Sequence, residues 1–109
     1  MSKFAILSDI HGNLFALEEV IGDIDNNEIS SLILLGDLID YGMQSNEVVE
    51  YIEKNLSSKI IGNIWGNHER AILTEDFNFF SSERGVESAK FTFSQLNDNS
   101  RNYLNNELD

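Results

Sequence analysis

Polar residues that can bind a metal or move a proton follow three short apolar runs of this chain. Residues 8–13 are Ser-Asp-Ile-His-Gly-Asn, residues 36–42 are Gly-Asp-Leu-Ile-Asp-Tyr-Gly, and residues 66–69 are Gly-Asn-His-Glu. Carboxylates, imidazoles and an amide oxygen together suit a borderline-hard divalent cation such as Mn, Fe or Zn. In an extended chain, residues two apart point the same way, so Asp9 and His11 can reach one ion. The sequence therefore predicts a metal site, provided that the fold brings the three clusters together.

The elements around these clusters predict such an arrangement. The apolar runs 4–7, 32–35 and 59–65 are strand-like, and the first two are continuous, as in strands covered on both faces. Between them, apolar residues recur at helical spacings: Leu14, Leu17, Val20, Ile21 and Ile24, and then Val48, Val49, Ile52 and Leu56. Alternating strands and helices predict an α/β fold, a parallel βαβαβ sheet with shorter helices after residue 66.

The carboxyl ends of parallel strands share one edge of a sheet, where ligands bind. We therefore expect one group of side chains to meet there: Asp9, His11, Asp37, Asn67 and His68. Taken singly, each cluster also has an ordinary interpretation, either an Asp/Gly turn after a strand or a helix start capped by Asn67. The same order of apolar run and polar cluster, repeated three times, favours a shared site.

Composition excludes several classes of function. The 109 residues include 7 basic and 19 acidic side chains, a net charge of −12, which repels nucleic acid backbones and anionic membranes. There is no cysteine, so a disulfide or a Cys-ligated zinc site is excluded. No apolar run is long enough to span a membrane and the strand-like segment begins almost at Met1, so we expect a cytoplasmic protein.

Three motifs resemble the first signatures of the calcineurin-like metallophosphoesterase family. They are Asp9-x-His11, Gly36-Asp37-x-x-Asp40 and Gly66-Asn67-His68-Glu69. The resemblance covers residues 3–75 well and the remainder loosely. It implies the amino-terminal half of an α/β/β/α sandwich with two divalent metal ions, and hydrolysis of phosphate mono- or diesters by a metal-activated hydroxide.

The resemblance also implies roles for individual residues. Asp9 and His11 would hold the first ion, Asp37 would bridge both ions, and Asn67 would hold the second. His68 would act as a general acid or stabilise charge on the phosphate, and Asp40 would orient His68. Tyr41 stands where the phosphoprotein phosphatases of this family have arginine, which favours the small bacterial phosphodiesterase-like members.

The chain departs from the family pattern in what it lacks. Its two histidines are already placed, so none is left for the family's later histidine motifs and the second ion should be held weakly. Residues 1–109 are thus expected to form one domain that holds only part of the family's fold. Without a second sheet, one apolar face would be exposed unless the helices after residue 85 cover it. We expect self-association or a partner chain to cover that face, or the chain to be truncated, and little activity from this chain alone.

Two alternatives to a phosphate-ester hydrolase remain open. A non-catalytic interaction module of the same fold, with a vestigial metal site, would explain the incomplete ligand set. The presence of both His68 and Asp40 favours the hydrolase, because a scaffold needs neither. A mononucleotide-binding domain is disfavoured, because residues 9–13 do not form a glycine-rich phosphate loop.

Overall fold

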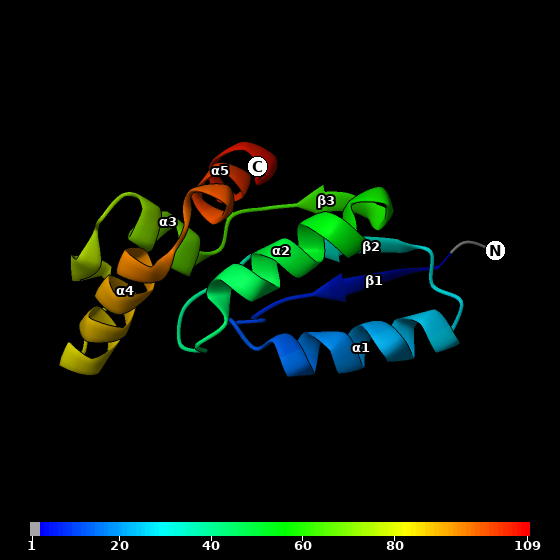
Figure 1. Ribbon diagram of the computed structural model, residues 1–109, viewed down its shortest axis with the longest axis horizontal. Helices are drawn as coiled ribbons and strands as arrows, with labels where there is room; N and C mark the ends of the chain where they lie inside the picture. The colour runs from blue at the N-terminus through cyan, green and yellow to red at the C-terminus, as the bar shows by residue number, and fades with distance from the viewer. Residues whose placement is uncertain (1–2) are drawn as a thin grey trace.

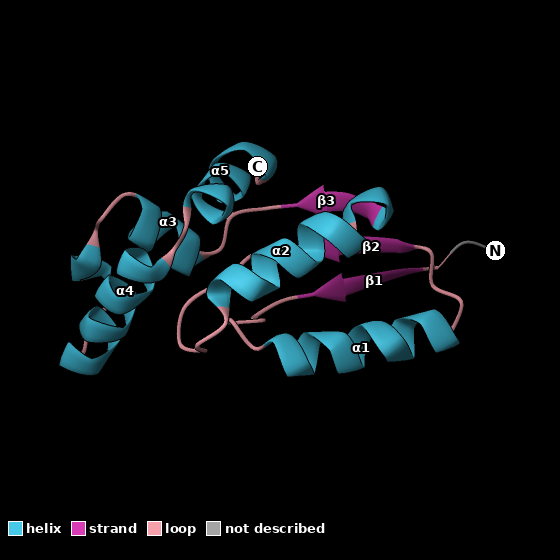
Figure 2. Cartoon of the chain, viewed as in Figure 1, coloured by secondary structure: helices cyan, strands magenta, loops and turns pink. Residues whose placement is uncertain are grey.

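The computed structural model describes residues 3–109 as an α/β domain built on a parallel sheet (Figures 1 and 2). The three strands lie in the order β1-β2-β3, with β2 paired in parallel to both neighbours. Chain order gives β1 (Phe4–Leu7), α1 (Leu14–Asn26), β2 (Ser31–Leu34), α2 (Ser45–Asn55), a 3-10 turn (Ser57–Lys59), β3 (Ile60–Asn63), α3 (Asn67–Leu73), a 3-10 turn (Phe77–Phe79), α4 (Glu83–Gln95) and α5 (Asp98–Glu107). The α/β fold predicted from the sequence is confirmed.

One face of the sheet carries the main core. Leu32 and Leu34 of β2 are fully buried because α1 and α2 pack against that face (Figure 1). The helices contribute the apolar positions that recur three and four residues apart: Leu17, Ile21, Ile24, Val48, Val49 and Ile52. The side-chain period of two in a strand places the intervening residues on the opposite face.

That opposite face is open. Phe4 is 57% exposed, Ile6 is 58% exposed and Ile61 is 65% exposed. The continuous apolar runs of β1 and β2 therefore do not correspond to cover on both faces within residues 3–109. The helices after residue 85 do not provide this cover, because α4 lies beyond the carboxyl ends of the strands and α5 beside the end of β3 (Figure 1).

The helices α3, α4 and α5 form a second packed layer at the carboxyl end of the sheet. Ile72 of α3, Ala89 of α4 and Leu104 of α5 are fully buried in the same core as β2. This layer lies next to the loops that follow the strands, so it can support the predicted site. Within residues 3–109, no helix combines the length and the apolar character that crossing a membrane requires.

Asparagine side chains cap two of the helices. The Asn13 side chain accepts a hydrogen bond from the Ala16 amide at 3.1 Å and so caps α1. The Asn97 side chain accepts from the Ser100 amide and so caps α5. Ser45 is the first residue of α2, and its hydroxyl accepts from the Asp40 amide at 3.1 Å.

Candidate metal centre

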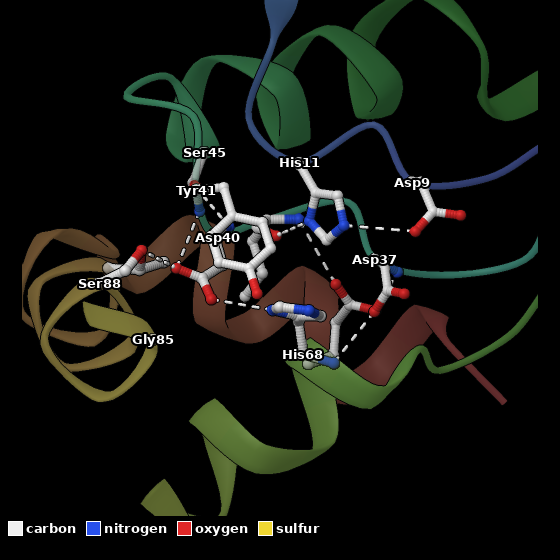
Figure 3. A network of polar contacts seen from close by, with 12 residues as sticks. Asp9, His11, Asp37, Asp40, Tyr41, Ser45, His68, Gly85 and Ser88 are labelled. Carbon is white, nitrogen blue, oxygen red and sulfur yellow. Dashed lines mark hydrogen bonds and ion pairs between the residues drawn. The ribbon is translucent and has the colours of Figure 1, made fainter. Parts of the chain in front are cut away.

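The structure brings side chains from all three strand ends together. His11 follows β1, Asp37 follows β2 and His68 is the second residue of α3, just after β3. Each offers a ligand atom, and these atoms all lie within 4.8 Å of one another. The two imidazole rings are 4.6 Å apart between centroids and meet edge to face (Figure 3). Elements far apart in the chain thus build one compact donor cluster.

The hydrogen bonds of His11 determine which ring nitrogen faces the cluster. Its Nδ1 lies 3.0 Å from the Ile39 carbonyl oxygen, which can only accept, so Nδ1 carries the proton. The free Nε2 lies 3.3 Å from Oδ1 of Asp9. Two acceptors this close repel unless a cation, or an extra proton on His11, lies between them. Such anchoring of the distal nitrogen is the usual arrangement of a metal-binding histidine.

Asp9 and Asp37 supply the carboxylates. A hydrogen bond from the Ser8 hydroxyl at 2.7 Å lowers the pKa of Asp9, so this 65% exposed side chain is anionic at neutral pH. Oδ1 of Asp37 accepts from the His68 amide at 3.0 Å, which joins the second strand end to the start of α3. The other carboxylate oxygen of Asp37 remains available to the cluster.

The loops that carry these residues have strained backbones. Within these loops, five of the seven non-glycine residues with positive φ in the described chain are found: Asp9 (56°), His11 (46°), Asp37 (54°), Asp40 (74°) and Tyr41 (65°). Such conformations are unfavourable for residues with a Cβ and persist only where neighbouring contacts enforce them. Here backbone bonds connect the loops directly, with the His11 amide donating to the Asp37 carbonyl and the Gly42 amide donating to the His11 carbonyl. Strain concentrated at one place is typical of a functional site.

Glu69 joins the loop after β2 to the loop after β3, a role that was not predicted from the sequence. The side chain is fully buried, and its carboxylate accepts from four amides: Gly66 (2.8 Å), Asp37 (2.6 Å), Leu38 (2.8 Å) and Ile39 (3.4 Å). Burial raises the pKa of Glu69, although the amide donors act in the opposite direction. The available signal was an acid directly after His68, three residues into a helix, where capping-box acids occur.

Two glycines allow these loops to approach. Gly36 has a φ of 87°, and a Cβ at this position would collide with the backbone of Gly66. A Cβ at Gly66 would collide with the Asp37 side chain. Glycine is therefore required where the second and third strand ends meet.

A buried acid–base pair lies beside the cluster. Asp40 Oδ2 is 2.8 Å from His68 Nδ1, and the two residues are 0% and 9% exposed. Burial raises the pKa of Asp40, but hydrogen bonds from Ser88, His68, Tyr41 and Thr92 together lower it below its ordinary value. An ionised Asp40 can only accept, so His68 Nδ1 carries the proton and its Nε2 is left free.

Asn67 and Tyr41 are exposed residues, the first next to His68 in the sequence and the second against its ring. Asn67 is the exposed first residue of α3 and lines a shallow hollow with Arg70 and Phe79. The 58% exposed ring of Tyr41 has its centroid 4.8 Å from that of His68 and 5.0 Å from that of His11 (Figure 3).

The donor set fits a divalent cation. It combines a carboxylate with two histidines whose Nδ1 atoms are occupied by hydrogen bonds, which leaves the Nε2 atom of each histidine without a proton. Nitrogen and carboxylate ligands of this kind suit Zn, Fe and Mn.

The cluster and the chain's motifs agree with a family match, since the family model described as calcineurin-like phosphoesterase covers residues 2–107. The chain belongs to this family.

Two individual proteins are similar to this chain. A protein of Methanocaldococcus jannaschii designated MJ0912 is 38% identical over 81 residues, which are 73% of this chain and 32% of that protein. The crystal structure of a metallophosphoesterase from Sphaerobacter thermophilus matches with a TM-score of 0.71 and 29% identity, over 97% of this chain and 40% of that one. This calcineurin-like phosphoesterase chain thus spans about a third of its curated relative and two fifths of its solved relative.

Proposed function

We propose that this chain carries the amino-terminal part of the active site of a metal-dependent hydrolase of phosphate mono- or diesters. The observation that supports it most is the convergence of His11, Asp37 and His68, whose ligand atoms lie within 4.8 Å of one another. The family supports hydrolysis, and the buried Asp40–His68 pair provides a group next to the cluster that can accept and return a proton.

The proposed roles follow from the contacts of each residue. Asp9, His11, Asp37 and Asn67 hold divalent metal, with Asp37 shared if a second ion binds. When bound, such a metal supplies positive charge against a phosphate and lowers the pKa of a water. His68, with Nδ1 donating to Asp40, would first take up a proton at its free Nε2; the resulting imidazolium, paired with Asp40, would then deliver that proton or stabilise negative charge on the phosphate.

The identity of the substrate is a further part of the proposal. Tyr41 lies against both histidines and contributes no positive charge to a phosphate dianion. A phosphodiester carries less negative charge than a phosphomonoester, so it is better matched to a site whose edge carries an uncharged tyrosine. We propose Mn²⁺ as the metal to test first; a cytoplasmic location stays a prediction from the sequence.

Because one face of the sheet is open, we expect low activity from this chain alone. Phe4, Ile6 and Ile61 leave an apolar surface that water disfavours. We propose that a second layer covers it, supplied by another copy, by a partner chain or by further sequence, and that this layer completes the metal ligands. The alternative, a non-catalytic module with a vestigial metal site, is favoured by the same incompleteness.

Colorimetric turnover of bis(4-nitrophenyl) phosphate by the purified chain tests the proposal. We expect slow hydrolysis that requires added Mn²⁺, stops with EDTA and falls about 10²-fold or more in His68→Gln, as for loss of a proton donor. Arg70→Gln, an exposed change two residues away, is the control and should retain the rate. Metal-independent turnover would contradict the proposed role of the metal, whereas no turnover above the blank at high protein concentration would favour the non-catalytic alternative.

A further inference from the structure

Two hydroxyls of α4 contact the buried acid that pairs with His68. Ser88 Oγ lies 2.7 Å and Thr92 Oγ1 lies 3.0 Å from Oδ1 of Asp40 (Figure 3 shows Ser88). Residues four apart on a helix share a face, so both hydroxyls come from adjacent turns of the same side of α4. The helix therefore reaches the site although none of the three sequence motifs lies in it.

The four contacts of Asp40 divide between its two oxygens. Oδ1 accepts from Ser88, Thr92 and the Tyr41 amide, the last at 2.8 Å, while Oδ2 faces His68 Nδ1. An ionised carboxylate only accepts, so both hydroxyls must be donors. With Oδ1 held by three donors, rotation of the carboxylate is blocked and Oδ2 is directed at the imidazole.

We propose that Ser88 and Thr92 are positioning residues of the candidate site, which act through Asp40 to hold His68 in one orientation and one tautomer. The expected effect of these residues on turnover rests on the proposed function, whereas their expected effect on the tautomer of His68 does not. The torsion that turns a carboxylate is broad and two-fold, so an aspartate held at Oδ1 by the Tyr41 amide alone is fixed less firmly toward His68. The proposal predicts a uniform Nδ1–H tautomer that depends on α4.

The tautomer is the decisive readout, because a merely structural role would leave it unchanged. We would record multiple-bond ¹H–¹⁵N spectra of the metal-free chain with ¹⁵N-labelled histidine at about pH 8, where an ordinary histidine is neutral. The wild-type chain should show His68 with a protonated Nδ1. In Ser88→Ala/Thr92→Val, His68 should show averaged signals of two tautomers, while His11, anchored by the Ile39 carbonyl, should not change.

Matched variants separate the hydroxyl contacts from general effects on α4. Ser94→Ala removes an exposed hydroxyl of the same helix that donates to the Phe91 carbonyl, so the wild-type spectrum is expected. Thr92→Ser retains a hydroxyl and should also retain the tautomer. If the double variant does not fold, Ser88→Ala alone, at a half-buried position, is measured in its place.

Turnover with Mn²⁺ gives a second readout. The double variant should lose about 10- to 100-fold in kcat, the usual effect of removing a partner behind a site residue, with KM nearly unchanged. A folded double variant with the wild-type His68 tautomer would overturn the proposal. An inactive wild-type chain would count against the proposed function only, because the tautomer comparison still decides the role of Ser88 and Thr92.

Discussion

Asp37→Asn is expected to weaken divalent metal binding at least about 10²-fold and to reduce any metal-dependent turnover to the blank. Asp37 belongs to the donor cluster with His11 and His68. Asparagine has the same shape, tolerates a φ of 54° as well as aspartate does, and can still accept from the His68 amide through its oxygen. The substitution therefore removes charge and one metal-binding oxygen while the loop stays in place. Titration calorimetry with Mn²⁺, or displacement of a bound fluorescent chelator, measures the effect.

The strongly acidic surface makes a control necessary, since a charge of −12 attracts cations without a specific site. Asp23→Asn removes one exposed carboxylate from α1 that belongs to none of the three motifs. It should leave the tight metal-binding event unchanged. Equal losses in Asp37→Asn and Asp23→Asn would mean that the measured binding is diffuse surface attraction.

Glu69→Gln is expected to lower the free energy of unfolding by about 2–4 kcal/mol. The buried carboxylate accepts from four amides, and a glutamine keeps one oxygen while its NH₂ group faces amide donors. Leaving a buried donor unpaired costs about 1–3 kcal/mol. Since small domains have only about 5–15 kcal/mol of stability, urea denaturation should show a clearly lower midpoint.

Glu19→Gln, an exposed change on α1, is the matched control and should shift stability by about 0.5 kcal/mol or less. Because Glu69 also holds the Asp37 amide, Glu69→Gln should weaken metal binding as well. A Glu69→Gln protein as stable as the control would contradict the assigned role of this residue in joining the loops.

Much of the fold follows from pattern alone. Apolar runs and helical spacings predict β1, α1, β2, α2 and β3 within a few residues of their observed bounds. Parallel order then requires the strand ends to meet, and His11, Asp37 and His68 do lie together. The continuous run of β1, however, suggested cover on both faces, whereas Phe4 and Ile6 are exposed on one. An apolar run shows that a strand has apolar side chains on both faces, but it does not show whether the same chain covers both faces.

The supporting contacts of the site were not predictable, for a physical reason. Ser88 and Thr92 reach Asp40 only through the way α4 packs at the end of the sheet, across more than forty residues of chain. A serine or a threonine in an amphipathic helix carries no signal of its partner. Glu69 lies within a motif, but its role depends on strained loops whose approach two glycines allow. Residue types identify the reactive groups, whereas tertiary packing determines which other residues hold those groups in position.

Anomalous diffraction from crystals of the chain grown with Zn²⁺ tests most directly whether separate strand ends meet around a shared cation. We predict a strong zinc peak about 2.0–2.2 Å from a ring nitrogen of His11 and from a carboxylate oxygen of Asp37. A second, weaker peak near Asn67 would agree with a loosely held second ion. Zinc found only on the acidic surface of α1, with His11 and Asp37 free of metal, would mean that the strand ends do not form a cation site.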